Sequence, residues 1–309
     1  MEFLQNSPVN KLNALVADTT SHMLTFLQNP PVNKLDALIA LVAVSAVSVA
    51  AAYIYLKKKV KGCLDRNVFK DFKLVKRTQI NHNSARFRFA LPTPTSVLGL
   101  YAGQFIRCRG IDREGKEVIR PYTPITLNSD VGYFELVVKM YPLGRMSHHF
   151  REMREGEYLA VKGPIDRFKY KPGQARSLGM LAGGTGITPM FQLIRAILEN
   201  PKDKTTIRLL YANHTFEELD LFASKFPNHF KVYYVLTQYH LPTACLNILT
   251  ASGGMERWQQ PHIEEMIQSH CPPPSPDIKI LRCGPPEMNK AMAAHLNELG
   301  YTKDMQFEF

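Results

Sequence analysis

Apolar and polar residues alternate between about residues 69 and 163, a period-two pattern that is typical of β-strands. The clearest run has apolar residues at every second position: Ala85, Phe87, Phe89 and Leu91. Three stretches rich in turn-forming residues separate the strand-like runs, namely 91–96, 111–116 and 127–132. One helix, from Met146 to about Met153, interrupts them. Several short strands at this spacing predict a small antiparallel β-barrel.

After the polar stretch 169–177 the pattern changes, because strand-like and helix-like segments now alternate. The predicted strands are short apolar runs: 179–182, 206–212, 230–237 and 277–283. The predicted helices carry apolar residues at helical spacing: 189–199, 215–225 and 286–299. This order predicts a parallel sheet, and hence an α/β domain. We place the barrel at 67–171, a linker at 172–178 and the α/β domain at 179–309.

The N-terminal part contains a long segment without charge. No residue from Ala37 to Leu56 is charged, and about 20 helical residues span about 30 Å, the thickness of a bilayer core. A buried helix or a signal peptide is the alternative, but the length and the lack of a clear cleavage site disfavour both. Four lysines follow and place the C-terminal side in the cytosol: Lys57, Lys58, Lys59 and Lys61. We therefore expect a transmembrane helix at 37–56 and a basic linker at 57–66.

A duplicated leader precedes the predicted membrane helix. Residues 3–17 return almost unchanged at 26–40, so the leader 1–36 contains an internal duplication. Two copies do not make a solenoid, which needs three or more units. We expect no separate function for the first copy.

The chain is basic, with a net charge of +11 over 309 residues. Residues 1–61 hold six lysines and three acidic residues, a charge of +3, so the other +8 belongs to residues 62–309. Anionic lipid or an acidic protein suits such a surface, and nucleic acid is the weakest candidate without a recognisable binding motif. The five cysteines include no CxxC pair, so neither a disulfide framework nor a zinc site is predicted. Adjacent His148 and His149 would point about 100° apart on a helix, so no metal is expected there.

The segment 179–189, GMLAGGTGITP, ends a predicted strand in glycines and begins a helix. Glycines let a ligand approach the backbone, and the N–H groups at a helix N-terminus attract anions. Thr188 is the expected N-cap and Pro189 the expected first helical residue. The segment therefore predicts a phosphate cradle, with a Gly-rich turn before a packed helix as the alternative.

Two motifs in the barrel region also suit a phosphorylated ligand. The sequence RPYT at 120–123 ends a strand, and its arginine can fork onto a pyrophosphate while the tyrosine and threonine can contact a flavin ring. The sequence GRMS at 144–147 begins the barrel's predicted helix and would form a second anion site. Taken singly, each is equally consistent with an ordinary strand end or helix cap.

The order of four motifs is more specific: RPYT, GRMS, GGTGITP, and CGPP at 283–286. In this order the chain resembles the ferredoxin reductase-like flavoproteins and, within them, the NADH–cytochrome b5 reductases, over about residues 64 to 309. The resemblance implies a membrane-anchored two-domain protein in which an antiparallel FAD-binding β-barrel precedes an α/β parallel-sheet domain that binds NADH. It also implies FAD and NADH as cofactors and cytochrome b5, an acidic haem protein, as partner.

The resemblance further implies a set of site residues. Contacts to FAD are implied for Arg120, Pro121, Tyr122, Thr123, Val137, Lys139, Tyr141, Gly144, Arg145, Met146, Ser147, Thr188 and Phe309. Contacts to NADH are implied for Gly183, Gly184, Thr185, Gly186, Cys283, Gly284 and Pro285. Catalytic roles are implied for Thr123, near the reactive flavin nitrogen, and for Cys283, near the nicotinamide.

The chain departs from the family pattern in two places. Phe105 stands where the family usually has histidine, and a phenyl ring cannot relay a proton. We hypothesise that flavin protonation is slower here or uses water. Residues 239–261 do not resemble the family, and the helix after Asn213 is short, so the nucleotide half is expected to be altered in preference or impaired.

These features together predict an NADH-dependent FAD reductase that passes single electrons to membrane-bound cytochrome b5. One alternative is a reductase for another acceptor, such as a ferric chelate or the acceptor of nitrate reductase-like proteins. Another is a flavin-binding protein without nucleotide turnover. The anchor is expected in the endoplasmic reticulum or the outer mitochondrial membrane, with the catalytic body in the cytosol.

Overall fold

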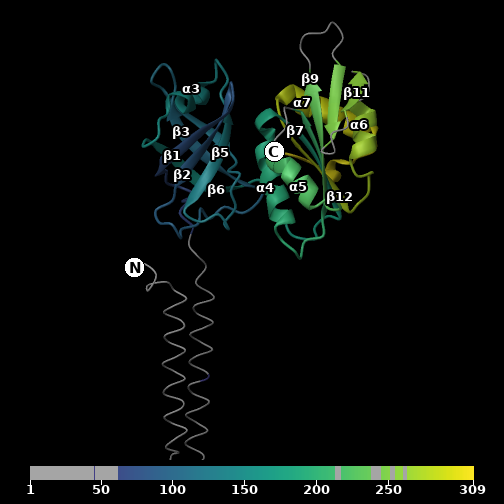
Figure 1. Cartoon of the computed structure of the whole chain (residues 1–309), viewed down its shortest axis with the longest axis horizontal. Helices are drawn as coiled ribbons and strands as arrows, with labels where there is room; N and C mark the ends of the chain where they lie inside the picture. Colours follow the sequence, from purple (N-terminus) through teal and green to yellow (C-terminus); the bar gives the residue numbers. More distant parts are fainter. Residues whose placement is uncertain (1–44, 46–61, 213–216, 238–244, 251–254, 260–262) are drawn as a thin grey trace, which may run out of the picture. The chain divides into compact units, whose positions relative to one another are not determined.

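The computed structural model describes residues 62–212, 217–237, 245–250, 255–259 and 263–309, together with Ser45 (Figure 1). The predicted leader 1–36 and, apart from Ser45, the predicted membrane helix 37–56 lie outside the described residues. Within the part that is described, no helix is long and apolar enough to cross a membrane.

The first sheet has six antiparallel strands in the order β4-β3-β6-β1-β2-β5. Its strands are β1 (Lys70–Asn81), β2 (Ser84–Ala90), β3 (Gln104–Ile111), β4 (Glu117–Tyr122), β5 (Tyr133–Lys139) and β6 (Tyr158–Asp166). Helix α3 (Arg145–Glu152) follows β5. The predicted alternation is confirmed, because Ala85, Phe87, Phe89 and Leu91 are all buried in one core.

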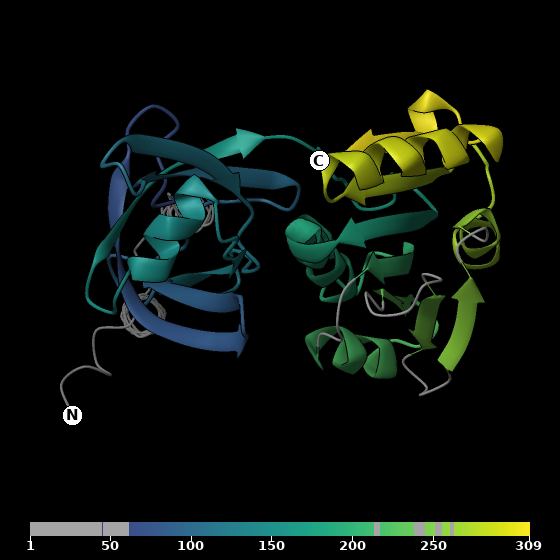
Figure 2. The same cartoon turned by 90° about the horizontal axis from the view of Figure 1, so that it is seen from above.

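The strands of this sheet curve around that core, as Figure 2 shows. Phe89 stacks on Phe134 at 5.1 Å between ring centroids, and Phe87 meets Phe150 of α3 at 5.0 Å. Strands β4 and β5 lie at the two edges. The predicted barrel is therefore an antiparallel sheet rolled around one core, and among the described strands no β4–β5 ladder closes it.

The second sheet has seven strands in the order β11-β10-β9-β8-β7-β12-β13. They are β7 (Ser177–Gly183), β8 (Thr206–Ala212), β9 (Phe230–Thr237), β10 (Cys245–Thr250), β11 (Met255–Gln259), β12 (Ile278–Cys283) and β13 (Gln306–Glu308). The helical segments around it are η2 (Gly184–Gly186), α4 (Ile187–Leu198), α5 (Glu217–Lys225), α6 (Ile263–His270), α7 (Pro286–Glu298) and η3 (Lys303–Met305). Every residue of β7 is buried, which makes this strand the centre of the α/β core.

The prediction of a parallel sheet holds for five of these strands and is wrong for the other two. Strands β9, β8, β7, β12 and β13 pair in parallel. Strand β10 pairs antiparallel with both β9 and β11, so the sheet is mixed. Both antiparallel strands fall within the divergent segment 239–261, for which no strand was expected.

The predicted N-cap of α4 is also wrong. Helix α4 begins at Ile187 with Gly186 as its N-cap, and a short 3-10 turn, η2, comes before it. Thr188 therefore lies inside the first turn, where its hydroxyl donates to the carbonyl oxygen of Thr185 at 3.1 Å. Pro189 is the third helical residue and not the first.

Candidate active site

A cavity of about 1140 Å³ lies between the antiparallel sheet and the α/β domain. All the predicted site residues line it except Gly184. Gly184 has a left-handed φ of 55°, and its carbonyl oxygen accepts a hydrogen bond from the Tyr211 hydroxyl at 3.2 Å. The structure thus brings together both halves of the predicted site and leaves this one glycine outside the wall.

The end of β4 and the facing strand β5 form one wall of the cavity. Arg120, Pro121 and Tyr122 end β4, and Thr123 follows. The Tyr122 ring meets Phe150 edge-on at 5.1 Å, and burial raises the pKa of its phenol. On β5, Lys139 places its ammonium 5.7 Å from the centre of the Tyr141 ring. This wall therefore combines aromatic faces, a hydroxyl and cationic side chains.

Helix α3 presents its N-terminus to the same cavity, with Gly144 as N-cap. The Ser147 hydroxyl oxygen accepts a hydrogen bond from the Tyr141 backbone N–H at 3.1 Å, which ties the helix start to the strand end. Arg145 donates through Nε to the carboxylate of Asp112 at 2.7 Å. Burial raises the pKa of that carboxyl, but hydrogen bonds from the backbone and from Arg145 outweigh it, and the pKa is lowered overall. Asp112 thereby fixes an arginine at the cavity wall.

The turns after β7 and β12 form the opposite wall, and glycines let them pack backbone against backbone. A Cβ at Gly186 would overlap the carbonyl group of Cys283. One at Gly284 would lie 2.7 Å from the sulfur of Met288, too close for a non-bonded contact. Because only hydrogen fits at the Cα of Gly186, the two turns lie directly beside each other at the cavity, whereas the Met288 side chain beside Gly284 can move.

Three helix starts converge on the cavity. The residues that line it include Gly144–Ser147 of α3, three residues before and in α4 (Gly186, Thr188 and Pro189), and Gly284–Pro286 at the start of α7. All three helix N-termini carry partial positive charge, and free N–H groups come mainly from α3 and the turn before α4, because Pro285 and Pro286 have none. The cationic side chains Arg120, Lys139 and Arg145 add full charges. This donor set fits anionic, diphosphate-bearing ligands such as FAD and NADH. The convergence of α7 was not expected from the sequence.

Cys283 ends β12 at the cavity, half-buried. Burial, and secondarily the charge of Glu308, raises the pKa of its thiol to about 11. The thiol is therefore protonated at neutral pH and cannot act there as a thiolate nucleophile. An apolar, neutral contact surface is what this side chain offers a ligand.

The C-terminal strand β13 joins the site to the antiparallel sheet. Phe309 lines the cavity, and its backbone N–H donates to the backbone carbonyl oxygen of Arg282 at 3.0 Å. Phe168, just after β6, lies 4.8 Å from the Phe307 ring and 5.9 Å from the Phe309 ring. Arg167 also donates to the Glu308 carbonyl oxygen at 3.0 Å. These contacts hold the aromatic end of the chain against the cavity.

The sequence analysis missed part of the wall at the ends of β3 and β6. Gln104 donates to the carboxylate of Asp166 at 2.7 Å, and this hydrogen bond lowers the pKa of that carboxyl. Arg167 also lines the cavity, and so does Phe105, which the sequence analysis had singled out. None of the described residues of 239–261 lines this cavity.

Comparisons with known proteins agree with this geometry. Profiles described as an oxidoreductase FAD-binding domain and an oxidoreductase NAD-binding domain match residues 71–170 and 180–294. NADH–cytochrome b5 reductase 1 of Arabidopsis thaliana is 59% identical over 275 residues, which cover 87% of this chain and 94% of that protein. The namesake protein of Dictyostelium discoideum is 43% identical over 261 residues, covering 82% of this chain and 85% of that protein.

A solved structure supports the same assignment. The cytochrome b5 reductase domain of Ulva prolifera nitrate reductase superposes with a TM-score of 0.69 at 30% identity, covering 81% of this chain and 100% of that domain. The described residues thus have a two-domain ferredoxin reductase-like fold with an FAD-binding and an NAD-binding domain. This chain belongs to the NADH–cytochrome b5 reductase family of the ferredoxin reductase-like flavoproteins.

Proposed function

We propose that this chain is an FAD-containing reductase that oxidises NADH and delivers electrons singly to cytochrome b5. The observation that carries the proposal is the cavity where three helix starts and four cationic side chains meet between an FAD-binding and an NAD-binding domain. The names of the relatives supply the acceptor, since they are NADH–cytochrome b5 reductases.

Different residues of the cavity wall would bind each of the two cofactors. Arg120, Arg145 and the N–H groups at the start of α3 would hold the FAD diphosphate. The Thr123 hydroxyl and the Tyr122 ring would contact the flavin, and the Gly186 and Gly284 turns would admit NADH. Bound FAD supplies the chemistry that links a two-electron hydride donor to a one-electron acceptor. The chain's own contribution is orientation and exclusion of water.

The basic surface and the N-terminal segment support the membrane-bound acceptor. The charge of +8 on residues 62–309 would steer an acidic haem protein toward the catalytic body. We propose that 37–56 anchors the chain in the endoplasmic reticulum or the outer mitochondrial membrane, with the body in the cytosol. Both membranes carry their lysine-flanked anchors in this orientation.

The test uses the full chain, purified in detergent with FAD and titrated without oxygen. We expect NADH to bleach the flavin absorbance at concentrations where NADPH does not, and the reduced protein to reduce cytochrome b5 at a rate that falls with added salt. A bound flavin that neither nucleotide bleaches would overturn the reductase proposal in favour of a flavin-binding protein. Reduction of a ferric chelate but not of cytochrome b5 would instead favour the other acceptor class.

A separate experiment tests the anchor. Membranes from expressing cells are washed with alkaline carbonate, and the chain is followed in pellet and supernatant. We expect the chain in the pellet and the variant Val47→Arg with Val49→Arg in the supernatant, because each charge near the bilayer centre costs about 2.5–3.5 kcal/mol. Release of the unaltered chain into the supernatant contradicts the anchor.

A further inference from the structure

One buried side chain of helix α4 makes hydrogen bonds to the antiparallel domain. Gln192 is fully buried, and its Oε1 accepts a hydrogen bond from the backbone N–H of Gly103 at 2.8 Å. Its Nε2 donates to the backbone carbonyl oxygen of Pro124 at 3.3 Å. One side chain of the α/β domain therefore satisfies backbone groups from two separate segments of the other domain.

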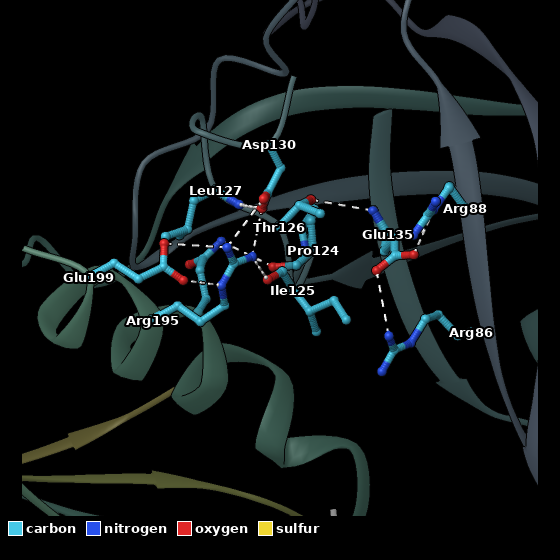
Figure 3. Close-up of polar contacts among 11 residues, drawn as sticks. Arg86, Arg88, Pro124, Ile125, Thr126, Leu127, Asp130, Glu135, Arg195 and Glu199 are labelled. Carbon is cyan, nitrogen blue, oxygen red and sulfur yellow. Dashed lines mark hydrogen bonds and ion pairs between the residues drawn. The ribbon is translucent and has the colours of Figure 1, made fainter. Parts of the chain in front are cut away.

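About one turn further along α4, Arg195 makes a second set of contacts to the antiparallel domain, which Figure 3 shows. Its guanidinium donates to both carboxylate oxygens of Asp130, at 2.6 and 3.2 Å, and to the Ile125 carbonyl oxygen at 3.2 Å. Glu199 holds the same guanidinium from within the α/β domain at 2.7 Å. Arg195 and Asp130 are each only 17% exposed, so this is a shielded, bidentate pair across the domain boundary.

Apolar packing makes the same junction rigid. Ile125, Val137 and Phe168 of the antiparallel domain belong to one buried cluster with Met190 and Phe191 of α4. In a close-packed cluster of this kind a helix cannot shift without opening voids. Gln192 is fully buried at this junction, so loss of its side chain would leave two buried backbone groups without their partner.

The segments that Gln192 contacts lie at the cavity wall, and Arg195 holds the continuation of one of them, Ile125 and Asp130. Gly103, Gln104 and Phe105 line the cavity, and Pro124 directly follows Thr123, which lines it as well. The first turn of α4, with Thr188 and Pro189, lies on the opposite wall. A single rigid helix thus carries one wall at its start and holds the other wall about one turn later.

We infer that Gln192 and Arg195 are positioning residues that set the separation between the flavin wall and the nucleotide wall of the cavity. The inference rests on the proposed function, because the distance that matters is the one over which hydride passes from NADH to the flavin. Misplacement of reacting groups by about 1 Å can cost about a hundredfold in rate. Neither side chain needs to touch either cofactor for this effect.

The decisive variants are Gln192→Leu and Arg195→Lys. Leucine removes both hydrogen bonds at similar size and leaves the Gly103 N–H and the Pro124 carbonyl unpaired. Lysine keeps the charge of Arg195 but not the two-pronged geometry. The matched control is Arg176→Lys, because Arg176 and Asp277 form the same kind of bidentate pair, at 2.7 and 3.3 Å, exposed and away from the cavity.

The first readout needs no cofactor. Hydrogen exchange of the Gly103 amide is followed in the flavin-free full chain, and we expect at least about tenfold faster exchange in Gln192→Leu. The second readout is flavin reduction by saturating NADH in stopped flow, together with the long-wavelength absorbance of the nicotinamide–flavin pair. We expect the two variants to retain FAD and a KM for NADH within about threefold, to reduce flavin about 10- to 100-fold more slowly and to lose that absorbance. The control should match the unaltered chain.

Two results would overturn the inference. One is a raised KM with an unchanged rate at saturation, which would make these residues part of nucleotide affinity. The other is an unchanged rate of flavin reduction in an Arg195→Lys protein that is folded and carries FAD. If Gln192→Leu does not fold, the Arg195→Lys result alone decides whether the inference stands. Failure of the proposed function looks different, because the unaltered chain itself would then not be reduced by NADH.

Discussion

The Cα atom of Gly186 lies so close to the carbonyl group of Cys283 that any side chain at 186 would overlap it. We expect Gly186→Ala to push the turn before α4 away from the turn after β12. Overpacking of this kind costs about 1–3 kcal/mol of stability, and the KM for NADH should rise by about tenfold or more because the nucleotide wall is displaced. Chemical denaturation and steady-state kinetics measure the two effects.

Gly115→Ala is the control for that substitution. Gly115 has a left-handed φ of 75°, but no atom lies within 4 Å of a Cβ there. The cost should be only the backbone strain of about 1–2 kcal/mol, with the KM unchanged. Equal effects of the two alanines on the KM would contradict the close-approach argument.

Phe105 lines the cavity, so Phe105→His would add an imidazole there that can hold and release a proton. If protonation limits the flavin half-reaction in this chain, turnover should rise, by roughly twofold or more, and gain a dependence on pH near neutrality. Phe105→Leu is the matched variant that cannot transfer protons. An unchanged rate in Phe105→His discards the hypothesis.

Burial and, to a smaller extent, the negative charge of Glu308 raise the pKa of the Cys283 thiol to about 11 and so keep it protonated. Glu308→Gln removes the negative charge, lowers that pKa and should speed alkylation of Cys283 by about three- to tenfold at mildly alkaline pH. Mass spectrometry of the labelled peptides gives the rate. Cys271, whose pKa burial raises to about 12, serves as the internal reference and should not change.

Burial lowers the pKa of His149 below its usual value of 6.5, although Glu157 opposes the shift. Its Nδ1 accepts the Ile111 backbone N–H at 3.3 Å, and its ring packs on Gly110, where a Cβ would lie 2.6 Å from a ring carbon. Below pH 6.5 the His149 imidazole binds a proton in the unfolded chain but not in the folded chain. The free energy of unfolding therefore falls as the pH falls toward the lowered pKa.

Removing this histidine should flatten that part of the stability profile. His149→Asn keeps a hydrogen-bond acceptor near the Nδ1 position but does not titrate. Urea unfolding at about pH 7.5 and about pH 5.5 should show a smaller loss of stability on acidification than in the unaltered chain. The same substitution at exposed His82 is the control, and an equal flattening there would refute the assignment.

Most of the fold could be predicted from the sequence because apolar residues recur at a different spacing in the antiparallel domain than in the helices of the α/β domain. Alternation every second residue placed Phe87 and Phe89 in the core, and helical spacing placed Leu193 and Ile197 of α4 there. Motifs at strand ends then located the cavity. The antiparallel hairpin of β10 and β11 was missed because no strand was assigned to 239–261, and β13 was missed because three residues are too few to show a period.

What stayed hidden in the sequence are contacts between distant backbone groups and polar side chains. Gln192 reads as a polar position on a helix, yet it is fully buried because its partner Gly103 comes from 89 residues away. The start of α4 was misplaced for a local reason. Thr188 can cap a helix or bond backward, and only the preceding 3-10 turn decides between them.

The placement of β12 between β7 and β13 has a consequence for biosynthesis. Until Ile278–Cys283 leave the ribosome, one edge of the wholly buried strand β7 has no partner, and its N–H and C=O groups are open to other chains. The turn after β12, which closes the nucleotide wall, is missing for the same period. Until β12 has been made, that open edge is a site for aggregation, and NADH cannot stabilise the chain by binding, because the turn after β12 belongs to the nucleotide wall.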